Sequence, residues 1–180
     1  MKLWQKNTEA SDAVTIFTVG KDREMDAYLA KFDVIGSLAH AKMLGKVGLL
    51  TASETQQLLT ALRGIYQKVE QGNFPLRPEM EDIHSQVEWE LTQQLGDIGK
   101  KVHMARSRND QVLVDIRLFL REELEKTAFA IQSLFSLLQE KSEQHKDVLL
   151  PGYTHLQLAM PSSFGLWFGA YAESLVDDCI

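Results

Sequence analysis

Two short polar segments without a helical pattern hold most of the side chains that are suited to chemistry. The second of them, residues 151–157, contains His155 between Thr154 and Gln157. Histidine is the one side chain whose unperturbed pKa lies near neutral, so His155 can accept or donate a proton at physiological pH. Thr154 and Gln157 are placed to orient a ligand beside it. The segment also fits a helix–helix linker whose histidine only hydrogen-bonds the core, and both interpretations stay open.

The first polar segment, residues 102–111, is basic in an otherwise acidic protein and leads into the longest expected helix. It contains Ser107, Arg108 and Asn109 in succession. Unpaired backbone N–H groups at a helix N-terminus attract anions, and arginine adds a two-pronged donor for a carboxylate or phosphate. The segment therefore fits an anion site. It also fits a solvated loop in which Asn109 only caps the helix.

A third candidate is the Glu-x-x-His pair formed by Glu81 and His84, with Glu88 expected on the same helix face. Such a pair is half of a di-iron carboxylate site in a helical bundle. A complete site needs a second Glu-x-x-His, and the sequence contains none; the paired-histidine zinc motif is missing as well. We therefore expect no metal site.

The elements that must position these residues are predicted to be helices throughout, because apolar residues recur with helical spacing and nothing alternates with period two for long. Thr51 and Glu54 form a predicted capping box at the start of the second helix. In the last helix, the small residues Gly165, Gly169 and Ala172 allow close approach of another helix. The predicted helices are Asp22–Lys46, Thr51 to about Gly72, Glu79–Leu95, Asp110–His145, and a last one with Pro161 in its first turn.

Composition limits the class of protein. The 180 residues are 44% apolar with a net charge of −6, which is typical of a soluble globular protein and argues against binding nucleic acid. No apolar stretch approaches the length of a membrane span, and the N-terminus lacks a signal-peptide pattern. Cys179 is the single cysteine, so no intramolecular disulfide can form. We expect a cytoplasmic protein with no membrane partner.

Several of these segments together resemble argininosuccinate lyase in their order and spacing. The resemblance covers nearly the whole chain, and the runs Arg106–Gln111 and Gly152–Gln157 are specific to this lyase and its crystallin relatives. The matching segments are Lys2–Trp4, Gly36–Ala41, Glu81–His84, Gly96–Lys100, His103–Gln111 and Pro151–Gln157, followed by Pro161 and Phe164-Gly165.

The resemblance implies an all-α fold and a β-elimination that splits argininosuccinate into arginine and fumarate, with no cofactor. It further implies a small N-terminal helical domain, residues 1–108, which leads into the first long helices of a central bundle, residues 109–180. The bundle of the family assembles as a homotetramer. The helical pattern is still running at Ile180, so we interpret the chain as the N-terminal part of such a lyase. A serine-bearing loop that the family uses is not in this sequence, and we expect the chain alone to be inactive.

Residue by residue, the resemblance assigns catalysis to His155 and substrate contacts to Asn109 and Thr154. Ser107, Arg108, Gln157 and His84 lie in the matching runs and are further candidates for substrate binding. Asp22 stands where the family usually has a serine, and Gln5–Thr8 replaces a Gly-Gly-Arg-Phe run. Two alternatives stay open: a related lyase acting on another succinyl adduct, and a crystallin-like protein that keeps the fold without turnover.

Overall fold

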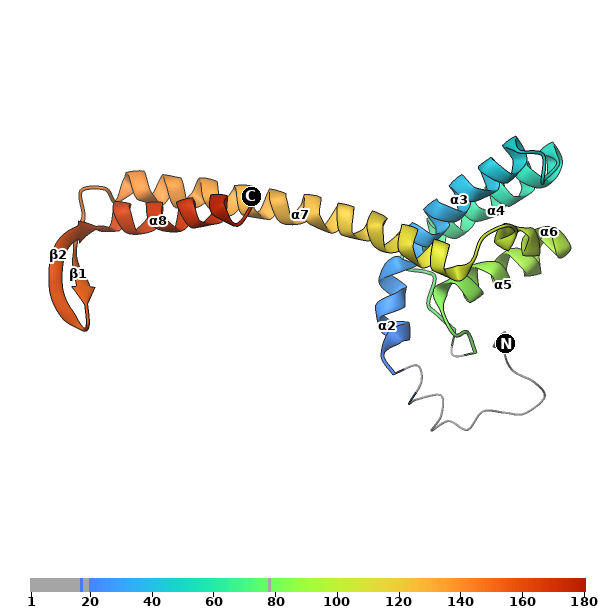
Figure 1. Cartoon of the computed structure of the whole chain (residues 1–180), viewed down its shortest axis with the longest axis horizontal. Helices are drawn as coiled ribbons and strands as arrows, with labels where there is room; N and C mark the ends of the chain where they lie inside the picture. The colour runs from blue at the N-terminus through green and yellow to red at the C-terminus, as the bar shows by residue number, and fades with distance from the viewer. Residues whose placement is uncertain (1–16, 18–19, 78) are drawn as a thin grey trace. The chain divides into compact units, whose positions relative to one another are not determined.

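The computed structural model describes residues 17, 20–77 and 79–180, and these form helices apart from one small hairpin (Figure 1). The chain divides into two compact units, Met1–Leu120 and Arg121–Ile180. The predicted all-α class is confirmed. The dividing point lies inside one long helix, and the predicted domain boundary between residues 108 and 109 stays a prediction. The Lys2–Trp4 match and the departure at Gln5–Thr8 lie outside the described residues.

The first unit begins with α2 (Asp22–Asp26), a 3₁₀ turn (Ala27–Leu29) and α3 (Ala30–Lys46), which together span the predicted first helix. Next comes α4 (Ala52–Glu70). The predicted capping box of α4 is confirmed, since the Glu54 backbone N–H donates to Thr51 Oγ1 at 3.2 Å and Glu54 Oε2 accepts from the Thr51 N–H at 2.9 Å.

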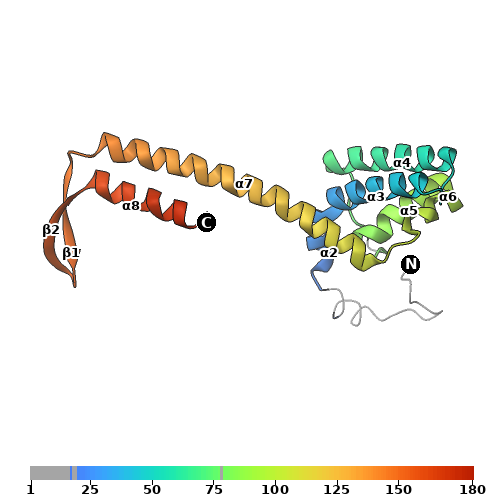
Figure 2. The ribbon, with the colours of Figure 1, turned by 45° about the horizontal axis from the view of Figure 1, so that its top comes forward.

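Helices α3, α4 and α5 (Ile83–Leu95) enclose the core of the first unit (Figure 2). Helix α5 starts four residues later than predicted because Asp82 is its N-cap and accepts a hydrogen bond from the Ser85 N–H at 2.7 Å. Glu81 therefore precedes the helix, and the predicted face shared by Glu81, His84 and Glu88 is wrong. The core side chains include Leu44, Leu58, Leu62, Ile65, Val87 and Leu91.

The segment predicted as an unbroken loop is partly helical. Helix α6 (Asp97–Lys100) and a 3₁₀ turn (Lys101–His103) come before α7 (Arg108–Gln144), which has 37 residues. Helix α7 thus begins two residues earlier than predicted. Leu113, Leu120 and Leu124 are among the large apolar side chains that α7 leaves exposed. In the part of the chain that the structure describes, no helix has the length and apolar character of a membrane span.

The second unit contains an antiparallel hairpin of β1 (Leu149–Thr154) and β2 (Gln157–Ser163), which the sequence pattern did not predict. The expected linker at residues 151–157 is instead most of β1 and the turn. Pro161 lies in β2 opposite Pro151, so its predicted place in the first turn of the last helix is wrong. That helix, α8, spans Phe164–Asp177 and is capped by the Ser163 hydroxyl.

Helix α8 packs against the end of α7 within the second unit (Figures 1 and 2). A Cβ added at Gly165 would lie 2.6 Å from Lys146 Cα, and the Ser142 hydroxyl donates to the Gly165 carbonyl at 2.7 Å. Ala172 is buried on α8. The prediction that small residues on this helix permit close approach is therefore confirmed.

Candidate functional site

A two-residue turn presents His155 at the tip of the hairpin. Thr154 and Gln157 are paired across the strands, and His155 and Leu156 between them have φ angles of 50° and 63°. Two-residue hairpin turns with positive φ usually carry Asn and Gly, because other side chains are strained in this conformation. Such strained positions cluster at functional sites, where the surrounding structure holds them. The turn therefore holds a histidine in a conformation that its sequence does not favour.

The hairpin brings three predicted site residues together, since Thr154, His155 and Gln157 occupy one turn and all three are exposed. The His155 ring makes no hydrogen bond with any residue that the structure describes. The alternative in which this histidine only hydrogen-bonds the core is therefore wrong for this structure. The imidazole of His155 is therefore exposed at the turn and open to contact by a ligand.

The start of α7 is capped by Ser107 and not by Asn109. Asp110 Oδ2 accepts from the Ser107 N–H at 2.8 Å, and Ser107 Oγ accepts from the Asp110 N–H at 3.4 Å. These bonds satisfy backbone groups that a helix leaves unpaired at its start. Asn109 is exposed in the first turn, and its side chain is not needed for the cap. The alternative role of Asn109 as a cap is wrong, and a ligand contact by Asn109 stays a prediction.

Arg108 joins the start of α7 to the start of α5. Its guanidinium is ion-paired with Asp82 and donates to Ser85 Oγ at 3.0 Å. Burial acts to raise the pKa of Asp82, but hydrogen bonds from Ser85 and the charge of Arg108 outweigh burial and lower the pKa. This ionised pair holds two helix N-termini together.

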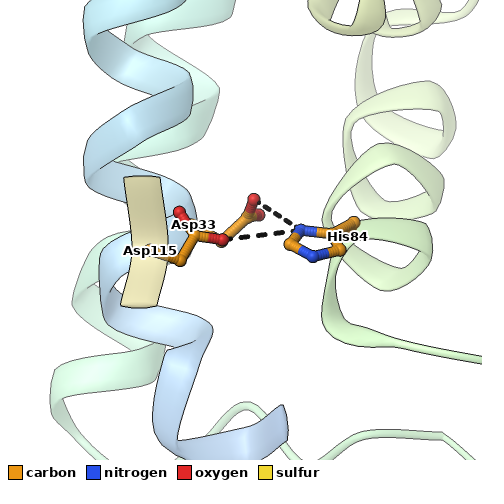
Figure 3. Close-up of side chains that lie close together, drawn as sticks. All are labelled: Asp33, His84 and Asp115. Atoms are coloured by element: carbon orange, nitrogen blue, oxygen red, sulfur yellow. Dashed lines mark hydrogen bonds and ion pairs between the residues drawn. The ribbon is translucent and has the colours of Figure 1, made fainter. Parts of the chain in front are cut away.

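His84 belongs to a buried cluster with Asp33 of α3 and Asp115 of α7 (Figure 3). The exposed fraction is 4% for His84 and 1% for each aspartate. His84 Nδ1 lies 2.8 Å from Asp33 Oδ1, a hydrogen-bond distance, and 3.7 Å from Asp115 Oδ2. Three helices therefore contribute one buried titratable side chain each to the cluster.

Burial and neighbouring charge shift the proton affinities in this cluster. Burial, with the nearby charge of Asp33, raises the pKa of Asp115 to about 7. Burial alone acts to lower the pKa of His84, but its hydrogen bond with Asp33 and the surrounding carboxylates outweigh burial and raise the pKa. The cluster thus favours an imidazolium with carboxylates around it.

Two further side chains complete the surroundings of the aspartates. Gln111 Nε2 donates to Asp33 Oδ1 at 3.2 Å, and Arg106 donates to Ser37 Oγ at 2.9 Å while its charge acts on both aspartates. The cluster brings three possible metal-ligand atoms within 4.8 Å of one another. Because His84 and Arg106 supply two positive charges to balance two carboxylates, we interpret it as an ionic hydrogen-bond network. The expectation of no metal site stays a prediction.

His84 and Arg108 also line a cleft of about 630 Å³ in the first unit. One part of its lining is acidic, and another part is an apolar face of α7 that includes Val112, Ile116 and Phe119. Asp22, which stands at the position of the family's serine, belongs to this lining. The acidic part of the lining is formed by Asp22, Asp26, Glu81 and Asp82.

The predicted site residues thus fall into two groups. The first unit holds His84 together with Ser107, Arg108 and Asn109 at the start of α7, and the second holds the three residues of the hairpin turn. Sequence reasoning missed Asp33 and Asp115. A signal was present for Asp33, because it lies four residues before Ser37 and eight before Ala41, which are both buried on α3.

Comparison with known proteins places this geometry in a family. A family model described as lyase matches residues 5–179. The chain belongs to this lyase family. It is 60% identical over 177 residues to the argininosuccinate lyase of Phocaeicola vulgatus, and the match covers 98% of the chain and 40% of that relative. It is 42% identical over 178 residues to the argininosuccinate lyase of Desulfitobacterium hafniense, with 99% and 39% covered. The chain therefore spans about two fifths of the length of these curated relatives.

Solved structures of other lyases share the fold of this lyase-family chain. EDDS lyase in complex with formate superposes with a TM-score of 0.71 at 25% identity, over 94% of the chain and 34% of that structure. The fumarate lyase:delta crystallin of Brucella melitensis superposes with a TM-score of 0.69 at 21% identity, over 87% and 39%. At 21% identity, the likeness to the Brucella melitensis protein supports the fold alone.

Proposed function

We propose that this chain supplies part of the active site of a carbon–nitrogen lyase that cleaves argininosuccinate to arginine and fumarate, a step of arginine biosynthesis. The observation that carries the proposal is 60% identity to an argininosuccinate lyase over 98% of the chain. Identity to EDDS lyase, a different member of the same fold, is 25%. This difference favours the substrate of argininosuccinate lyase over that of EDDS lyase.

A β-elimination of this kind needs a proton acceptor, a proton donor for the leaving nitrogen, and donors for the carboxylates on which charge develops. His155 is the proposed proton-transfer group, because it is exposed and held at a fixed turn. Thr154 and Gln157 flank it as proposed substrate contacts. The chemistry assigned to these residues requires no cofactor.

The first unit is proposed to contact substrate through Asn109, with Ser107, Arg108 and His84 nearby. Arg108 is already paired with Asp82, so its contribution is to fix the start of α7 as well as to offer a guanidinium face. Argininosuccinate carries both cationic and anionic groups. The cleft beside His84 offers both signs of charge, since acidic side chains and Arg108 line it together.

We further propose that the lyase is a cytoplasmic homo-oligomer, as the family resemblance implies a tetramer. Large apolar side chains that α7 leaves exposed, such as Leu113 and Leu124, support association. The chain spans about 40% of its curated relatives. We therefore expect the 180-residue chain alone not to release fumarate from argininosuccinate.

The test is a fumarate-absorbance assay of argininosuccinate cleavage by the complete product of the gene. His155→Ala should lower kcat by about 10²–10⁴-fold, as expected for loss of a proton-transfer group, with a smaller effect on KM. Leu156→Ala is the matched control, because its side chain is 98% exposed in the same turn, and should leave kcat unchanged. No cleavage by the complete product, or a near-normal kcat in the His155 variant, would contradict the proposal. Turnover by the 180-residue chain would contradict the expected inactivity.

A further inference from the structure

We infer that Asp33 and Asp115 are positioning residues for His84, which fix its ring and keep a proton on Nδ1 so that Nε2 is the nitrogen left to act on a ligand. The inference rests on the proposed function, because it takes the cleft beside His84 to receive part of the substrate. Neither aspartate belongs to the residues that the family resemblance assigned.

The geometry gives each nitrogen of His84 a different role. Nδ1 lies between two carboxylates, at 2.8 Å from Asp33 and 3.7 Å from Asp115. A carboxylate only accepts hydrogen bonds, so Nδ1 must carry the proton in this contact. Nε2 is buried and has no hydrogen-bond partner among the residues that the structure describes. His84 is among the residues that line the cleft, and we take its unpartnered nitrogen as the one available to a bound group.

The three side chains come from separate helices, and this fixes the ring more firmly than a local contact would. Asp33 is held on its other side by Gln111, whose Nε2 donates to the same Oδ1 atom at 3.2 Å. Gln111 and Asp115 lie four residues apart and are the two buried residues of α7. The partners of His84 are thus themselves held in place.

Charged groups from every neighbouring element act on the cluster. The carboxylates are Asp26 of α2, Asp33 of α3, Asp82 at the cap of α5 and Asp115 of α7, and all four favour a protonated His84. Arg106, before α7, is the opposing charge, and it acts on Asp33 and Asp115. The hydrogen bond with Asp33 and the surrounding acidic groups favour the imidazolium form, in which Nε2 also carries a proton and would donate a hydrogen bond to a carboxylate of the ligand.

A network that served only to stabilise the fold would satisfy its buried polar atoms. In this one Asp33 Oδ2, Asp115 Oδ2 and His84 Nε2 all lack hydrogen-bond partners within the described residues. Replacing buried ion pairs with apolar side chains often leaves stability unchanged or improves it. The cluster is therefore better explained by what it does to His84 than by stability.

The test is a pH titration of the 180-residue chain labelled with ¹³C and ¹⁵N histidine, followed by NMR. The His84 signals are assigned as those lost in His84→Asn. We expect the pKa of His84 above its ordinary value, and the neutral ring above that pKa to carry its proton on Nδ1. Asp33→Asn should lower the proton affinity of His84 by about tenfold or more. It should also let the neutral ring place its proton on Nε2.

Asp115→Asn should lower the same affinity by less than Asp33→Asn, because its oxygen is farther from Nδ1. Asp97→Asn, which removes an exposed carboxylate paired with Lys100, should leave His84 unchanged. A native His84 that titrates at or below its ordinary pKa, or that keeps Nε2–H when neutral, overturns the inference even if no variant folds. The NMR result does not depend on turnover. The lyase assay can fail while His84 shows the expected pKa and tautomer, and the lyase assay can succeed while His84 does not show them.

Discussion

Changing Asp115 to asparagine should make the first unit less sensitive to rising pH. Burial raises the pKa of Asp115 from 3.8 to about 7 in the folded chain, so folding favours the protonated carboxyl group. A raised acidic pKa contributes stability that is fully present below pH 3.8 and is lost as the pH rises to about 7. At about 1.4 kcal/mol per pH unit, the loss over that window is about 4 kcal/mol. Asparagine does not ionise, so the Asp115→Asn variant does not undergo this loss of stability.

His84 changes stability in the same direction. Folding raises the pKa of His84, so its contribution to the free energy of unfolding is fully present below the ordinary pKa of 6.5. That contribution is lost as the pH rises through the pKa of His84 in the folded chain. Asp115→Asn removes one of its carboxylate neighbours, so the contribution of His84 shrinks in the variant. Both effects reduce the fall of the unfolding free energy between pH 5 and 8. From Asp115 alone, the native chain should lose about 3 kcal/mol between pH 5 and 7.

The assay is urea unfolding followed by Trp89 fluorescence, in a background where Trp4 and Trp167 are changed to phenylalanine. Trp89 lies in α5 and reports on the unit that contains the cluster. The matched control is Asp110→Asn on the same helix. Hydrogen bonds with Ser107 lower the pKa of Asp110, so its contribution to the free energy of unfolding is constant above pH 5. Asp110 therefore adds nothing to the change of that free energy with pH in this range. If the free energy of unfolding falls equally between pH 5 and 7 in the native chain and in Asp115→Asn, the reasoning is refuted.

Three further predictions concern the second unit and the association of the whole chain. Gly165→Ala should destabilise the second unit by about 1–3 kcal/mol in thermal unfolding, because the added methyl group overpacks against α7. At Gly169 the nearest atom to an added Cβ is 3.5 Å away, so Gly169→Ala should be neutral or stabilising in the same assay. Leu156→Gly should relieve strain worth about 1 kcal/mol or more at the turn, seen as slower amide hydrogen exchange in β1 and β2, and unchanged exchange would mean that the turn is unstrained. The 20.4 kDa chain should self-associate through its exposed apolar helix faces, and a clean monomer in light scattering at high concentration would contradict this.

The helices could be predicted where local signals agreed with tertiary packing. Thr51 and Glu54 define the start of α4 through a capping box that depends only on neighbouring residues. Asp82 gave an equally local signal for α5, but the prediction placed the start at Glu79. The apolar stripes of α3 and α7 were sufficient to predict both helices, since their length and spacing leave little ambiguity.

The hairpin could not be predicted in the same way. Its residues do not alternate between apolar and polar types, because most side chains of both strands are exposed and no buried face imposes a period of two. The turn residues His155 and Leu156 are not the Asn-Gly type that signals a hairpin. The two prolines, Pro151 and Pro161, face each other in the register, whereas Pro161 was expected in the first turn of a helix. Strand pairing here comes from the chain reversal and not from residue preference.

The features that local rules failed to predict are also the ones that carry the proposed chemistry. The His155–Leu156 turn at positive φ and the two buried aspartates are both uncommon arrangements, and each requires compensation from the surrounding structure. For Asp33 the compensation is the hydrogen bonds from His84 and Gln111, and for both aspartates it includes the charges of His84 and Arg106. Sequences usually satisfy local and tertiary preferences together, and the positions that do not are expected at functional sites. Two such sites, in separate units of one chain, are therefore a physical argument for function that does not depend on the family resemblance.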